Sequence, residues 1–159
     1  MKPNIFAKLL MVIIIGTTLI GLGCCFVVVP DFMTLFPSHY PEFSNWIIPW
    51  MVLIYICAVP CFGAMGISWK IASNIRKDRS FCYENARLFR IFSYLALGDS
   101  IVLGLGSVAY WLCGLNHPGL LVIEFLVVFV GLAIYVCTSA LSYLVAQAAA
   151  LQEDSDLTI

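Results

Sequence analysis

The chain has 159 residues, of which 62% are hydrophobic and only 11% charged, and its mean hydropathy is +1.00. Soluble domains average about 45–50% apolar and about 25% charged residues, so a chain this short could not cover its apolar surface as a soluble globule. The formal net charge of -1 leaves no electrostatic footprint for direct binding of nucleic acid. The composition therefore predicts an integral membrane protein.

Apolar runs predict where the chain crosses the membrane. A spanning helix needs about 20 mostly apolar residues, because the hydrocarbon layer is about 30 Å thick and the helix rises about 1.5 Å per residue. The segments that meet this requirement are residues 9–29, 47–69, 91–112 and 120–146. We therefore predict an all-α integral membrane fold, with four transmembrane helices in one domain over residues 1–159.

The basic residues predict the orientation. All eight lie near the N-terminus or in the inner loop 70–90, whereas segments 30–46 and 113–119 contain none. Short loops rich in Lys and Arg stay in the cytoplasm. We therefore expect both termini, loop 70–90 and the tail 147–159 to be cytoplasmic.

An acid within the third span is the main polar feature of the membrane interior. Asp99 lies about 12 Å from the inner boundary, and a charged side chain facing lipid there costs at least about 2.5–3.5 kcal/mol. We expect Asp99 to face the other helices. The polar side chains predicted at a similar depth are Thr17, Thr18, Cys61, Ser100, Thr138 and Ser139. Two interpretations stay open: a protonated acid that donates a structural hydrogen bond, which is favoured, and a proton or cation site in a small oligomeric transporter or pore.

The predicted outer side carries a second acid and an unusual loop. Glu124 lies about 6 Å below the outer boundary, within reach of lipid headgroups or of the rims of the other spans near Cys25, Ser107 and Tyr110. Segment 30–46 has prolines among aromatic residues, so we expect it to lie on the bilayer surface or to cap the bundle. It is the candidate surface for an external lipid or peptide, and an immunity or sensor role is a further alternative.

Enzymatic motifs are missing from the sequence. There is no nucleophile–base pair, phosphate-binding loop or HExxH, and the different depths of Asp99 and Glu124 argue against paired-acid catalysis. Cys57 and Cys61 are four apart on one helical face, but no further Cys or His cluster accompanies them, and free cysteines behave as small apolar residues. We predict a non-enzymatic protein with no cofactor and no metal.

Two cytoplasmic strings carry a family resemblance. The first reads Phe81-x-x-Glu84-Asn85-Ala86 and continues into the third span, and the second is the closing Leu-Gln-Glu-Asp-Ser-Asp-Leu-Thr-Ile. Together they resemble an uncharacterised bacterial family of small four-helix membrane proteins, described only as a domain of unknown function. A Ser commonly follows the Phe in that family and would cap the helix, whereas Cys82 stands at that position in this chain.

The resemblance implies a location and a partner. It implies the bacterial plasma membrane, and its members are often encoded beside a small helix-turn-helix regulator, which implies a membrane partner for that regulator. We expect the contact surface to lie on the inner face. Its candidate residues are Phe81, Glu84, Asn85, Arg87 and Arg90, together with Gln152, Glu153, Asp154 and Asp156 in the stretch 152–159.

Overall fold

The computed structural model describes residues 3–39 and 41–157. Its elements are α1 (Pro3–Gly23), the π-helical turn η1 (Cys24–Val28), α2 (Val29–His39), the 3-10 helix η2 (Pro41–Trp46), α3 (Ile47–Arg76), α4 (Tyr83–Leu112) and α5 (Pro118–Leu157). Four helical stretches are long and apolar enough to cross a membrane: Ile5–Leu35, Ser44–Arg76, Tyr83–Leu112 and Pro118–Ser155. The predicted all-α, four-span fold is confirmed.

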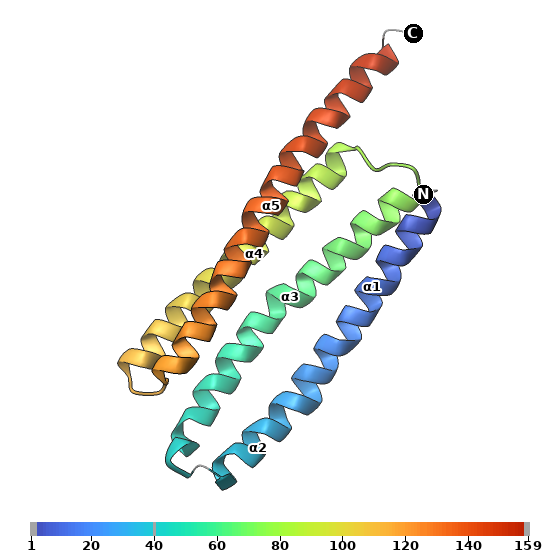
Figure 1. The fold of residues 1–159 in the computed structure, drawn as a ribbon. Coiled ribbons are helices and arrows are strands. Elements are labelled where there is room, and N and C mark those ends of the chain that lie inside the picture. The colour runs from blue at the N-terminus through green and yellow to red at the C-terminus, as the bar shows by residue number, and fades with distance from the viewer. Residues whose placement is uncertain (1–2, 40, 158–159) are drawn as a thin grey trace.

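The long helices pack in a row, in the order α1, α3, α4, α5 (Figure 1). Within the described residues α1 makes no extensive contact with α4 or α5. The start of α1, the connection between α3 and α4, and the end of α5 share one end of the row, and α5 extends furthest there (Figure 1). We call this the basic end, because it carries residues 70–90, and we call the end with η2 and residues 113–117 the far end.

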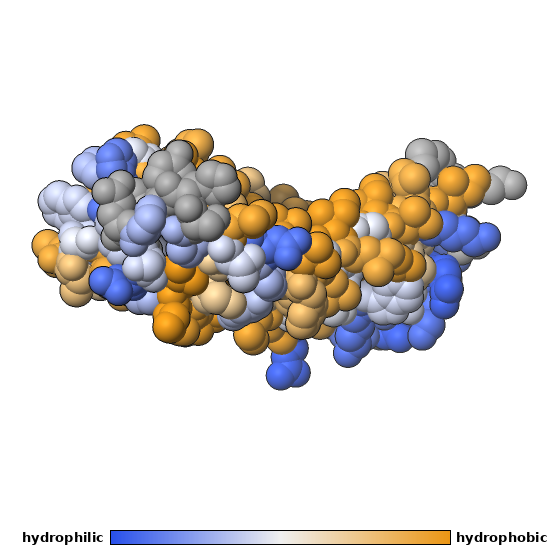
Figure 2. All heavy atoms as spheres, turned by 90° about the horizontal axis from the view of Figure 1, so that it is seen from below, coloured by the Kyte–Doolittle hydropathy of each residue, from blue (hydrophilic) through white to orange (hydrophobic). Residues whose placement is uncertain are grey.

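Most apolar side chains face outward. Figure 2 shows large connected apolar areas across the visible face, and many large apolar side chains are more than half exposed. The small buried cluster between α1 and α3 contains Met11, Ile14 and Ala72. Acyl chains cover such a surface without cost, so helix association depends instead on close packing and on hydrogen bonds.

Two glycines allow the close packing. A Cβ atom on Gly106 of α4 would lie 2.7 Å from Cδ1 of Leu53 in α3, and a Cβ atom on Gly131 of α5 would overlap Oγ of Ser100 in α4. Small residues at helix contacts let backbones approach one another in lipid. These two positions therefore fix the spacing of α3, α4 and α5.

The first span continues beyond the expected boundary at residue 29. In η1 the amide of Val29 donates to the carbonyl of Cys24, five residues earlier. The next donor in this pattern would be Pro30, which has no N–H and leaves the Cys25 carbonyl without its backbone partner. The Tyr55 hydroxyl of α3 donates to that carbonyl at 2.9 Å. This replacement bond accounts for the passage of a helix through proline.

Segment 30–46 was expected to lie on the bilayer surface or to cap the bundle, and the structure adds its secondary structure. Its described part is mostly helical, as the continuation α2 and the short helix η2. Helix α2 ends at His39 and η2 begins at Pro41, and position 40 lies outside the described residues.

Candidate functional site

A buried pair of asparagines organises the basic end. The Asn74 Nδ2 of α3 donates to Asn85 Oδ1 of α4 at 2.8 Å. Asn85 Nδ2 in turn donates to the carbonyls of Arg79 and Ser80, at 3.1 and 2.9 Å. Asn85 is 1% exposed. It therefore joins the two helices to the connection between them, and it is a structural residue rather than part of the contact surface proposed from the sequence.

Three further interactions surround this pair. Lys70 Nζ lies 2.9 Å from Oε1 of Glu84, and Glu84 Oε2 accepts a longer bond of 3.4 Å from Asn74. Ser142 of α5 donates to the carbonyl of Ala86 at 2.7 Å. Three helices are thus joined within the first turn of α4, where the acidic Glu84 also suits the positive end of the helix.

Cys82 occupies the N-cap position of α4 without capping it. Its side chain makes no cap bond, and its Sγ donates instead to the Arg79 carbonyl at 3.4 Å. The N-cap of α4 therefore lacks a side-chain hydrogen bond, and the Asn85 bonds to the preceding carbonyls hold this connection.

A cavity of about 470 Å³ lies between the start of α4 and the end of α5. We call it the basic-end groove. Its lining residues are Arg79, Phe81, Cys82, Tyr83, Glu84, Ala149, Gln152 and Glu153. Two stretches that are far apart in the sequence, each proposed as contact surface, therefore line a common groove. 

The remaining candidates of the inner face lie outside this lining. Arg87, Arg90 and Asp154 are exposed, and the side chain of Asp156 lies outside the described residues.

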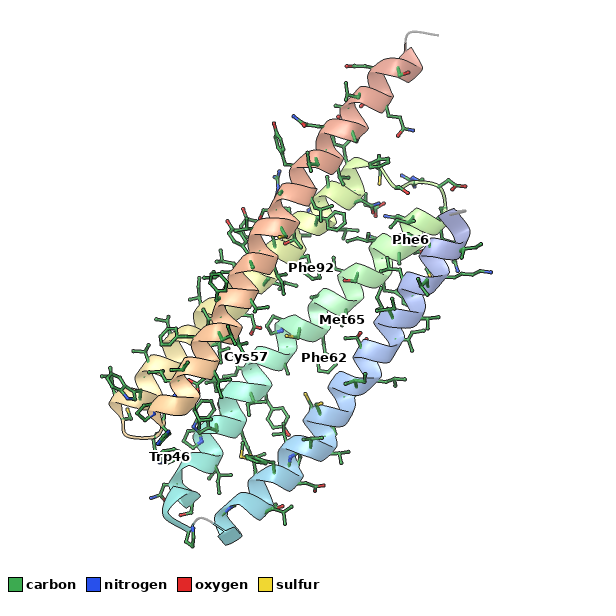
Figure 3. The ribbon with its side chains drawn as sticks, viewed as in Figure 1. Phe6, Trp46, Cys57, Phe62, Met65 and Phe92 are labelled. Carbon is green, nitrogen blue, oxygen red and sulfur yellow. The ribbon has the colours of Figure 1, made fainter. Side chains whose placement is uncertain are left out.

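Asp99 lies against α3 and meets a thiol. Cys61 Sγ is 3.7 Å from Asp99 Oδ2, and Asp99 Oδ1 is buried with no hydrogen-bond partner among the described residues. Cys57 lies one turn earlier on α3 (Figure 3). Within the part of the chain that the structure describes, no group of three or more His, Cys, Asp or Glu side chains is placed to hold a metal ion.

The hydroxyls predicted near Asp99 serve their own helices. Each donates to a carbonyl four residues earlier, at 2.7–2.9 Å: Thr17, Thr18, Ser100 and Thr138. Ser139 is half-buried. Side chains of Ser and Thr commonly satisfy themselves in this way within helices. These four hydroxyls therefore bond within their own helices, and the thiol of Cys61 is in contact with Asp99.

A second cavity, of about 650 Å³, lies at the far end between α2, α3 and α5. We call it the far-end cavity. Its lining residues are Val28, Val29, Phe32, Met33, Trp46, Ile47, Trp50, Ile54, His117, Leu120 and Glu124. Trp46 marks this region in Figure 3. Glu124 is only 9% exposed, and its Oε2 accepts a bond of 2.8 Å from Nδ2 of Asn116.

Aromatic side chains tie α3 to the α4–α5 connection beside this cavity. Trp50 Nε1 donates to the Leu115 carbonyl at 3.0 Å, and the Tyr110 hydroxyl donates to the Pro49 carbonyl at 2.9 Å. The two rings meet edge to face, with centroids 5.5 Å apart. Sequence reasoning placed Glu124 near the headgroups but missed its partner Asn116, whose only signal was a polar residue eight positions earlier.

Comparison with known proteins gives one family and one relative. A family model described as "Protein of unknown function (DUF2975)" matches residues 32–159. The chain is similar to the uncharacterized membrane protein YoaS of Bacillus subtilis (strain 168), with 27% identity over 160 residues that cover 98% of this chain and 97% of the relative. No solved structure matches the chain.

Proposed function

This chain belongs to the DUF2975 family of proteins of unknown function, and from that premise we propose that it is a non-enzymatic protein of the bacterial plasma membrane whose basic-end groove binds a cytosolic helix-turn-helix regulator. The orientation in this proposal has both termini and the basic end in the cytoplasm. The retention of Lys and Arg on the cytoplasmic side supports it.

The observation that carries the proposal is the basic-end groove itself. Phe81 and Tyr83 are large aromatic side chains at the polar end of the helices, and yet they are 58% and 55% exposed. Aromatic residues of this kind are enriched at the centres of protein interfaces. The Asn74–Asn85 bond beneath them holds the connection in place, so a partner would meet a preorganised surface.

The acidic charge of the tail supports contact with a basic segment of the partner. The stretch 147–159 carries acids and no Lys or Arg. Its described acidic side chains, Glu153 and Asp154, are exposed on the end of α5, which projects beyond the other helices (Figure 1). A DNA-binding protein presents a basic surface. The projecting end of α5 therefore suits a regulator whose DNA-reading face it would cover.

In-cell crosslinking tests this proposal. A photoreactive residue at position 81 should crosslink to the small helix-turn-helix protein encoded nearest the gene, whereas the same residue at exposed position 112, at the far end, should not. The substitution Phe81→Ala should lower recovery of that protein in the membrane fraction. Tyr94→Ala, which removes another exposed ring of α4 away from the groove, is the matched control. Equal recovery with all variants would refute the proposal.

A second candidate function is supported by the unpartnered oxygen of Asp99. A buried acceptor without a donor is costly, and such intramembrane acids mark ion pathways in other membrane proteins. One acid in four spans suits a small transporter or pore only in an oligomer. This candidate predicts that Asp99→Asn lowers proton or cation flux into liposomes, while unchanged flux would remove it.

A further inference from the structure

The far-end cavity is apolar except at one side. Side chains of α2 and α3 supply most of its walls, including Phe32, Met33 and Ile54, and Leu120 of α5 completes them. The cavity lies within helical stretches that are apolar enough to cross a membrane. A lipid can therefore reach it laterally, with its acyl chain along these walls.

The polar side of the cavity is a carboxylate. Glu124 is 9% exposed, lines the cavity and has no cation within ion-pair distance among the described residues. Its hydrogen-bond partner Asn116 is 6% exposed, and Asn116 Oδ1 is buried with no partner in the described part of the chain. A buried carboxylate with a single neutral donor is costly, because an ion out of water needs an opposite charge or several hydrogen bonds. The Glu124 carboxylate is therefore suited to a ligand that brings a positively charged hydrogen-bond donor.

The lack of basic residues near the cavity disfavours a ligand of net negative charge. Segments 30–46 and 113–119 contain no Lys or Arg. Besides the indole N–H groups of Trp46 and Trp50, the lining carries the imidazole of His117, whose Nδ1 accepts from the amide of Gly119 at 3.1 Å. In that tautomer Nε2 carries the proton and is a donor to a phosphate oxygen. The Glu124 carboxylate, with its single neutral donor, matches an ammonium group, and the Nε2–H of His117 matches the phosphodiester to which that ammonium is linked.

We infer that the far-end cavity is a binding site for an aminophospholipid, phosphatidylethanolamine, with its ammonium group on Glu124 and an acyl chain along the apolar walls. The inference is independent of the proposed regulator, which would bind at the other end of the helices. It gives segment 30–46, which was expected to lie on the bilayer surface or to cap the bundle, the role of a cavity wall.

Native mass spectrometry of the delipidated full chain tests this directly. Phosphatidylethanolamine, phosphatidylcholine and phosphatidylglycerol with identical acyl chains are offered at equal concentration. Phosphatidylethanolamine should be retained about tenfold more than the other two, a difference of about 1.4 kcal/mol, because only its ammonium group is both positively charged and a hydrogen-bond donor to the Glu124 carboxylate. Equal retention of the three lipids, or preference for phosphatidylglycerol, would overturn the inference without any variant.

Variants then locate the site. Glu124→Gln should abolish the preference, and Leu120→Phe, which fills the cavity and keeps the carboxylate, should lower retention of all three lipids. Asp31→Asn removes an exposed carboxylate of α2 and should change nothing. An unchanged preference in Glu124→Gln would overturn the assignment of the ammonium site. Binding of a long-chain alkylamine or a cationic peptide, with no preference for phosphatidylethanolamine, would instead indicate a free amine or a peptide ligand and would equally overturn it.

Discussion

Asn85→Ala should loosen the connection between α3 and α4. The substitution removes the acceptor of Asn74 Nδ2 and the donor to the carbonyls of Arg79 and Ser80, so that three hydrogen bonds of 2.8–3.1 Å are lost together. The helices themselves retain their backbone bonds. The expected result is therefore local opening of residues 77–82 rather than loss of the fold.

The magnitude follows from the three bonds. Each contributes about 1 kcal/mol net, and water replaces part of this at the part-buried bond to Arg79, which leaves about 2 kcal/mol. That free energy corresponds to an increase of about thirtyfold in the open population, because about 1.4 kcal/mol is a factor of about ten.

Limited trypsin digestion in detergent measures this opening, since Lys77 and Arg79 are cleavage sites within the connection. Cleavage there should accelerate by about the same factor, about thirtyfold, when reclosing is fast. Asn45→Ala, at an exposed asparagine of η2, is the matched control. A cleavage rate in Asn85→Ala equal to that of the control would refute the reasoning that this buried amide holds the connection.

Two further substitutions test the membrane interior by thermal unfolding in detergent. Tyr55→Phe leaves the Cys25 carbonyl without its donor and should lower stability by about 1 kcal/mol, and an unchanged melting temperature would show that the helix passes Pro30 without this bond. Gly131→Leu places a side chain against Ser100 and should cost about 1–3 kcal/mol through overpacking of α4 on α5, so a variant as stable as the natural protein would contradict the close contact.

Hydropathy was sufficient to predict the four helices, because a span is a property of a continuous stretch of side chains. The end of the first helix was not predictable in this way. Pro30 normally signals a helix end, and its tolerance depends on the hydroxyl of Tyr55, which is 30 residues away from Cys25 in the sequence. A hydrogen bond between residues so far apart in the sequence cannot be predicted from a local sequence pattern.

In the candidate sites, too, the sequence predicted which end a residue lies at but not the contacts between distant residues. The sequence placed Phe81, Glu84 and the tail on one face by topology alone, whereas the groove that joins them depends on where α5 passes the start of α4. Asn85 was included with the contact residues as a member of the Phe81-x-x-Glu84-Asn85-Ala86 string. Its burial follows from the pairing with Asn74, which only the packing of α3 on α4 reveals.

The central claim is that the chain crosses the membrane four times with its basic end in the cytoplasm, and two native cysteines test it most directly. Cys82 lies at the basic end and the exposed Cys113 at the far end. In intact cells an impermeant maleimide should label a variant that retains only Cys113, and a variant that retains only Cys82 should react only after the membrane is permeabilised. Labelling of Cys82 in intact cells would contradict the orientation and the cytosolic partner proposed from it.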